Sequence, residues 1–215
     1  MHLLAQVLNF IVERQDVILK ALGQHAYITF LASALSAVVG LGLGIVITRH
    51  QALRGVILGT VGLLYTIPAL SLFFFLIPIM GIGTPPAVLA IFIYGLLPIV
   101  QNTYVGIQQV NPAVKEAARG MGATEFQLLS KVELPLAFPV IFGGIKNMLV
   151  MNIAIATIAV FVGAGGLGDI IMKGIRTFND VMTLAGTLVV AVVAIVTEQL
   201  FGILERQLSR SKFGR

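Results

Sequence analysis

The sequence predicts an all-α, polytopic membrane protein, and three observations carry this prediction. Of the 215 residues, 58% are apolar and only 11% are charged, a composition outside the range of soluble globular domains. Several apolar runs are each long enough to span a bilayer, which takes about 20 helical residues. The chain has no Cys and three scattered His, so disulfide scaffolds, thiolate chemistry and metal sites are not expected.

Residues 1–24 are predicted to form an amphipathic helix at the membrane surface. Apolar residues recur there at helical spacing, while Glu13, Arg14 and Asp16 interrupt them. These charges, and the lack of a basic segment before them, argue against a secretory signal peptide. The alternative is an N-terminal extension without a stable helix.

The membrane domain is expected to cover residues 25–208. Its apolar runs predict five spans, at residues 26–48, 55–80, 86–107, 138–162 and 181–204. Pro68 and Pro78 interrupt the second run, and a short segment at 165–175 would raise the count to six. Two glycine pairs with four-residue spacing predict close helix packing, Gly40 with Gly44 and Gly55 with Gly59.

The positions of the basic residues predict the orientation. With the polar stretch 112–135 on the cytoplasmic side, nine of the 14 Lys and Arg lie inside, four lie outside, and Lys146 lies within a span. This distribution obeys the positive-inside rule. It places the N-terminus outside and the C-terminus, with a basic tail at 209–215, in the cytoplasm. Because the cations lie in short clusters between apolar runs, the net charge of +5 does not predict a nucleic-acid partner.

The polar stretch 112–135 is predicted to begin with a short helix. Asn111 suits the N-cap and Pro112 the first helical position, and Gly120 and Gly122 then end the helix. Its alanines would let a partner protein approach the backbone, with charged contacts at the rim. A DNA-binding helix-turn-helix is disfavoured because membrane spans begin on both sides. An ordinary connecting loop remains an alternative.

A second short helix is predicted after the glycines. Thr124 and Gln127 have the spacing of a capping box, in which each side chain satisfies a free backbone donor of the other residue. Pro135 disfavours helical backbone at Leu134, so this helix is expected to end near Glu133.

Across the loop, a motif resembles the EAA loop of permease subunits of ATP-binding-cassette importers. It comprises Glu116-Ala117-Ala118, Gly122 and the sequence Val132-Glu133-Leu134-Pro135, with Val132 where the family usually has Ile. The resemblance implies a type I importer transmembrane fold and a cytoplasmic coupling helix that docks into an ATP-hydrolysing subunit. The coupling residues it implies are Lys115, Glu116, Ala117, Ala118, Arg119, Gly122, Leu134 and Pro135.

Further segments, at 65–70, 97–104 and 163–168, resemble permeases of the glycine betaine, carnitine and choline importers. The resemblance implies a bacterial inner-membrane permease subunit for a small osmoprotectant, working with a second permease copy or paralogue, two cytoplasmic ATPases and an extracytoplasmic substrate-binding protein. The chain contains no Walker motif, so it is not expected to be an enzyme, and ATP and Mg²⁺ would bind the partner ATPase. The alternatives are a permease for another small solute, such as an amino acid, and a stand-alone secondary transporter.

Candidates for the translocation path are aromatic, polar or charged residues within the spans, together with one proline. Ring faces attract quaternary ammonium groups, although lipid-facing packing also explains membrane aromatics. For Lys146, a functional role and snorkelling of its side chain to the cytoplasmic interface both remain open. The path candidates are Tyr65, Pro68, Phe73, Tyr94, Asn102, Lys146 and Asn152.

A glycine-rich segment follows the fourth apolar run. Gly163, Gly165 and Gly168 match G-x-G-x-x-G, but no strand precedes them, so a dinucleotide site is not predicted. Together with Gly166, they are expected to form a bend that belongs to an external gate.

Overall fold

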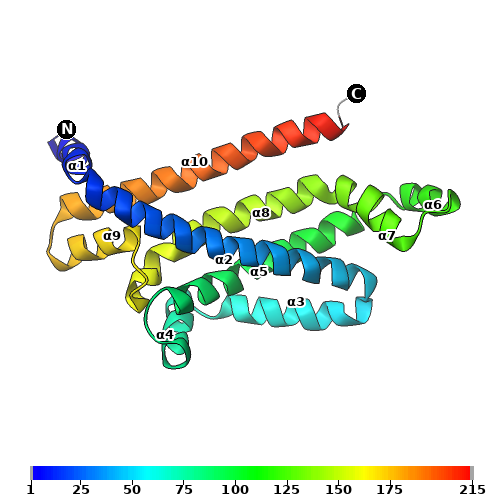
Figure 1. Ribbon diagram of the computed structural model, residues 1–215, viewed down its shortest axis with the longest axis horizontal. Coiled ribbons are helices and arrows are strands. Elements are labelled where there is room, and N and C mark those ends of the chain that lie inside the picture. Colours follow the sequence, from blue (N-terminus) through cyan, green and yellow to red (C-terminus); the bar gives the residue numbers. More distant parts are fainter. Residues whose placement is uncertain (1, 214–215) are drawn as a thin grey trace.

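Helices joined by short turns make up residues 2–213, which a computed structural model describes (Figure 1), and no β-strand occurs within this range. In chain order the elements are α1 (His2–Glu13), α2 (Gln15–Arg49), α3 (Gln51–Thr66), α4 (Ala69–Met80), α5 (Thr84–Gln108), α6 (Pro112–Gly120), α7 (Glu125–Leu128), the π-helix Leu129–Glu133, α8 (Leu134–Ala156), the 3₁₀-helix Thr157–Val162, α9 (Leu167–Arg176) and α10 (Asp180–Phe213). The all-helical prediction is confirmed.

Within the described residues, four helices are long and apolar enough to cross a membrane, and a bent pair raises the count to five. The pair is α3 and α4, which meet at 98°. The bend occurs where Ile67 adopts extended backbone before Pro68, because a proline disfavours helical geometry in the residue before it. The predicted second run is therefore a broken segment. The candidate sixth segment is α9, whose 10 residues reach only about 15 Å and cannot span a bilayer.

The centre of the molecule is a layer in which α5 packs between α2 and α8. Small residues on α2 bring its backbone close to α5: a Cβ added at Gly40 would lie 2.8 Å from the Ile99 side chain, and one at Gly44 would lie 2.5 Å from that of Thr103. The predicted close packing is confirmed for this pair. It is wrong within this chain for the pair on α3, because no atom lies within 4 Å of a Cβ at Gly55 or Gly59.

At one end of the molecule, α1 and α9 pack against α10 and the start of α2 (Figure 1). The predicted segment 1–24 is divided at Arg14: residues 2–13 form α1, and residues 15–24 belong to α2. Val7 of α1 is buried, whereas Leu4 and Leu8 are exposed. This apolar exposure suits a helix that lies against lipid.

The helices α6 and α7 lie at the opposite end of the molecule (Figure 1). We call this end the loop end, and we call the end with α1 and α9 the far end. The helices α6 and α7 thus lie at the tip of the molecule, and residues 129–135 lead from this tip into α8 of the central layer. The predicted basic tail, 209–215, lies outside the part of the chain whose side chains the structure describes.

Candidate functional site

The first loop helix, α6, begins and ends as predicted. The Asn111 carboxamide oxygen accepts a hydrogen bond from the Ala113 N–H at 2.9 Å. The helix ends at Gly120, and Gly122 adopts φ +83°, a conformation that favours glycine. Ala117 is exposed, whereas Ala118 is buried against the rest of the chain. Only one of the two motif alanines therefore faces outward.

The second loop helix has the predicted capping box but not the predicted end. The Gln127 N–H donates to the Thr124 hydroxyl at 3.2 Å, and the Thr124 N–H donates to the Gln127 side chain at 2.9 Å. Helical structure then continues without interruption from Glu125 to Val162. The expected end near Glu133 is wrong, because the second loop helix and the following span form one continuous helical segment.

A π-helix explains how the chain accommodates Pro135. In an α-helix the proline ring would collide with the carbonyl four residues earlier and leave it without a donor. Here the turn before the proline is widened, and the Leu134 N–H bonds to the Leu129 carbonyl, five residues back. Such widened turns re-aim side chains and are frequent at functional sites.

The widened turn contains Glu133, whose side chain is only 2% exposed. One carboxylate oxygen accepts a hydrogen bond from the guanidinium of Arg49, the last residue of α2. The other lies 3.5 Å from the ammonium of Lys115, in α6. The end of α2, 84 residues earlier in the sequence, and the first loop helix therefore meet on one buried carboxylate.

The Lys115 side chain is directed inward and is only 18% exposed. Besides its contact with Glu133, its ammonium donates to the Ile107 carbonyl near the end of α5, at 2.9 Å. The coupling role that the EAA resemblance implies for Lys115 stays a prediction.

A second, exposed ion pair joins the two loop helices. The Arg119 guanidinium donates to Glu125 at 3.1 Å, and Arg49 lies 3.6 Å from the other oxygen of the same carboxylate. The hydrogen bond from Arg119 holds the pKa of Glu125 below its usual value and raises the pKa of Arg119. Because these groups are exposed, the pair stabilises the loop only weakly.

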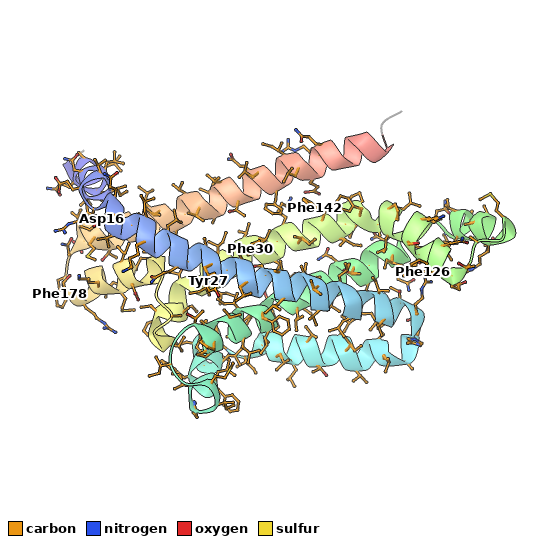
Figure 2. All side chains as sticks on the ribbon, in the orientation of Figure 1. Asp16, Tyr27, Phe30, Phe126, Phe142 and Phe178 are labelled. Carbon is orange, nitrogen blue, oxygen red and sulfur yellow. The ribbon has the colours of Figure 1, made fainter. Side chains whose placement is uncertain are left out.

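Exposed apolar side chains occur on this otherwise polar loop. Met121 is 84% exposed and Phe126 76%, and Phe126 projects from the loop end in Figure 2. We refer to these two residues and the exposed Val114 and Ala117 of α6 jointly as the apolar knob. Large apolar side chains that are exposed on a polar segment are typical of an interaction surface. Sequence reasoning missed both residues, although Met121 lies between the two loop glycines and Phe126 lies in the first turn of the second loop helix.

Four of the path candidates lie around the α3–α4 bend. The Tyr65 and Tyr94 rings meet edge to face, with centroids 5.7 Å apart, and the Tyr94 hydroxyl donates to the Ile67 carbonyl. Pro68 forms the bend itself, and Phe73 is fully buried in the same apolar cluster as Tyr94.

The other path candidates lie apart from that bend. Asn102 bonds within its own helix, and Asn152 is fully buried and donates to the Ser33 hydroxyl at 2.9 Å. Lys146 lies 2.9 Å from the carboxylate of Glu205 in α10, a partner that the sequence did not predict. The seven candidates therefore do not form one cluster.

The predicted glycine bend is present at the far end. Gly163, Gly165 and Gly166 all have positive φ, whereas Gly168 is needed for close packing, because a Cβ there would lie 1.9 Å from the Thr157 carbonyl. The Gly166 N–H donates to the Gln24 side chain of α2 at 3.3 Å. The bend therefore rests directly on α2.

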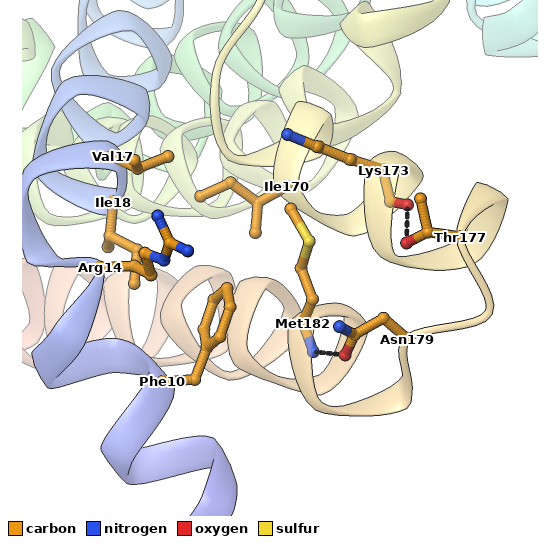
Figure 3. A pocket seen from close by; sticks show the side chains of 9 residues that line it. All are labelled: Phe10, Arg14, Val17, Ile18, Ile170, Lys173, Thr177, Asn179 and Met182. Carbon is orange, nitrogen blue, oxygen red and sulfur yellow. Dashed lines mark hydrogen bonds between the residues drawn. The ribbon is translucent and has the colours of Figure 1, made fainter.

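Beside the bend, a cavity of about 310 Å³ opens where α1, α2, α9 and α10 meet (Figure 3). Arg14 and Lys173 contribute its cationic groups, and Phe10 contributes an aromatic ring. The Asn179 side chain accepts a hydrogen bond from the Met182 N–H at 2.9 Å, which fixes the turn between α9 and α10. Among the described residues, no cluster of His, Cys, Asp or Glu could hold a metal ion.

Known proteins resemble this chain over most of its length. The sequence model of the family described as binding-protein-dependent transport system inner membrane component matches residues 37–210. The osmoprotectant import permease protein OsmW of Salmonella typhimurium is 44% identical over 182 residues, which are 82% of this chain and 85% of that protein. The carnitine transport permease protein OpuCB of Listeria monocytogenes is 39% identical over 203 residues, 94% and 93% of the two chains. The choline transport system permease protein OpuBB of Bacillus subtilis is 39% identical over 186 residues, 86% of each chain.

Solved structures share the fold. A chain of the MetNI methionine ABC transporter, in an inward-facing conformation, matches with a TM-score of 0.84 at 21% identity, over 91% of this chain and 98% of that chain. A chain from an amino acid ABC transporter crystallised with histidines matches with a TM-score of 0.78 at 20% identity, over 92% and 96%. The fold expected for a type I importer permease is confirmed.

Proposed function

Because this chain belongs to the family of binding-protein-dependent transport system inner membrane components, we propose that it carries a small osmoprotectant, such as glycine betaine, carnitine or choline, as the permease subunit of an ATP-driven importer. The chain is a multi-pass membrane subunit and is not itself an enzyme. The names of relatives at 39–44% identity support the solute class.

The observation that carries the coupling role is the apolar knob at the tip of the loop. We assign it to the contact with the ATPase, with Glu116 and Arg119 at the charged rim. Burying a large apolar side chain stabilises a complex by about 1.5–3 kcal/mol, so Met121 and Phe126 suffice to dominate such an interface. ATP and Mg²⁺ bind in that partner, and α6 is the segment that follows its movement.

The assembly follows from the same assignment. The loop end faces the cytoplasm, in agreement with the positive-inside count, and the far end faces the extracytoplasmic side. Two ATPases dock on two permease chains, either copies or paralogues, and a substrate-binding protein delivers solute at the far end. The glycine bend and its neighbour α9 lie where that delivery takes place.

For the solute path, we place the Tyr65–Tyr94 pair first among the candidates. Tyr65 is 39% exposed, so its ring can face a path formed with the second permease chain. Aromatic faces attract quaternary ammonium groups. Phe73 is fully buried in the apolar cluster that also contains Tyr94 and packs against Ile67, so we assign it to support of the bend and not to contact with solute.

The test is uptake by a reconstituted complex. The chain is purified with its cognate ATPase and binding protein, inserted into liposomes, and supplied with labelled glycine betaine, choline or carnitine in parallel with labelled histidine and methionine. We expect saturable, ATP-dependent uptake of at least one quaternary ammonium solute. Uptake of only the amino acids would refute the solute class but not the permease role.

A further inference from the structure

Helix α2 connects the two ends of the molecule without a break. It runs from Gln15 to Arg49, 35 residues, or about 52 Å at 1.5 Å per residue. Its last residue contacts the loop, and its external third contacts the glycine bend. The proposed function assigns the first of these segments to the contact with the ATPase and the second to the side where solute is delivered.

At the loop end, α2 contacts the loop through an ion pair with a buried carboxylate. Glu133 is withdrawn from water, and its two oxygens contact Arg49 and Lys115 separately. A buried carboxylate that loses one of its partners is left as an uncompensated charge, which is strongly unfavourable. A displacement of α6 or of the base of α8 is therefore expected to carry the end of α2 with it.

At the far end, α2 contacts the bend closely. The Gln24 side chain accepts a hydrogen bond from the Gly166 N–H, and a Cβ added at Gly165 would lie 2.8 Å from the same side-chain oxygen. His25, one residue further, is fully buried and bonds to the Ile153 carbonyl near the end of α8 at 3.1 Å. With so little free space, α2 cannot shift without moving the bend.

We propose that Glu133 is a positioning residue that joins the cytoplasmic loop to α2, and that α2 transmits the movement of the loop to the glycine bend. The inference rests on the proposed function, because it needs an ATPase that moves the loop. It adds Glu133 and Arg49 to the residues that couple the permease to the ATPase. It also assigns to α2 the transmission of movement from the loop end to the far end.

A purely structural role for Glu133 makes a different prediction. If the buried ion pair only stabilised the fold, its loss would lower the amount of assembled complex, and the remaining complex would work normally. If it transmits movement, assembly and basal ATP hydrolysis persist, but stimulation of hydrolysis by the loaded binding protein is lost.

The first experiment compares Glu133→Gln, Arg49→Gln and the double variant with wild type in the reconstituted complex. Both single variants should lower stimulation about tenfold per assembled complex, and the double variant should be no worse than either one, because both act through one contact. Glu125→Gln is the matched control: it removes a neighbouring but exposed partner of Arg49, and stimulation should stay within about twofold of wild type. If Glu133→Gln assembles poorly, Arg49→Gln alone gives the same readout.

The second experiment detects movement of the bend. The chain has no Cys, so Ala164→Cys introduces a single thiol at a position that is 8% exposed. Its labelling rate should differ between the resting complex and the complex trapped with ATP and vanadate, and Glu133→Gln should abolish that difference.

Two results would overturn the inference while leaving the proposed function intact: normal stimulation per assembled complex in both single variants, or an unchanged labelling difference at position 164 in Glu133→Gln. Absence of stimulation in the wild-type complex would overturn the proposed function and this inference with it.

Discussion

Replacing Phe126 by Ala tests whether the apolar knob is the docking surface. The side chain is 76% exposed, so its removal leaves the interior of the permease intact. Complete burial of a Phe side chain contributes about 1.5–3 kcal/mol. Because about three quarters of the side chain can still be buried on docking, Phe126 should contribute about 2 kcal/mol to the free energy of binding to the ATPase. That corresponds to roughly a 30-fold increase in the dissociation constant.

The assay is the affinity of the detergent-solubilised permease for its purified ATPase, measured by surface immobilisation of either partner. Phe178→Ala is the matched control, because Phe178 is 94% exposed but lies at the far end (Figure 2). It should bind the ATPase as wild type does. An unchanged affinity for Phe126→Ala, or an equal loss for both variants, would refute the assignment of the knob.

Two further predictions concern stability. Gly168→Ala should lower the melting temperature by several degrees, because its Cβ would lie 1.9 Å from a backbone carbonyl oxygen. At Gly23 no atom lies within 4 Å of an added Cβ, so Gly23→Ala should leave the melting temperature unchanged or raise it slightly. Equal melting temperatures for the two variants would contradict the close packing at Gly168. The lowered pKa of Glu125 means that its pair with Arg119 stabilises the loop above the unfolded pKa and that this contribution is lost as the pH falls through the lower folded value. Wild type should therefore melt slightly above Glu125→Gln at pH 7 and level with it in strong acid, and a gap that widens in acid would contradict this sign.

Local chemistry made the loop predictable from the sequence. Asn111, Thr124 and Gln127 cap helices through hydrogen bonds to residues two or three positions away, so these caps can be predicted from the sequence without tertiary structure. The same holds for the glycines that end α6, and for Pro68, whose effect on the residue before it breaks the second apolar run.

The contacts that organise the loop base were not predictable in this way. Glu133 and Arg49 are 84 residues apart in the sequence, and only the packed helices bring them together. Pro135 indicates a disturbance of the helix because proline has no backbone N–H to donate. Both a helix end and a widened turn accommodate this missing hydrogen bond, and the sequence pattern does not distinguish between them. Likewise, nothing local to Lys115 indicates that its side chain turns inward.

ATP hydrolysis by the assembled complex tests the central claim most directly. The complex of permease, ATPase and binding protein is reconstituted with wild-type chain and with Glu116→Lys, which reverses a charge on an exposed face of α6. We predict that solute-loaded binding protein stimulates hydrolysis in the wild-type complex and that this stimulation is lost in Glu116→Lys, while membrane insertion remains intact. Equal stimulation in both complexes would contradict the assignment of the loop as the coupling site.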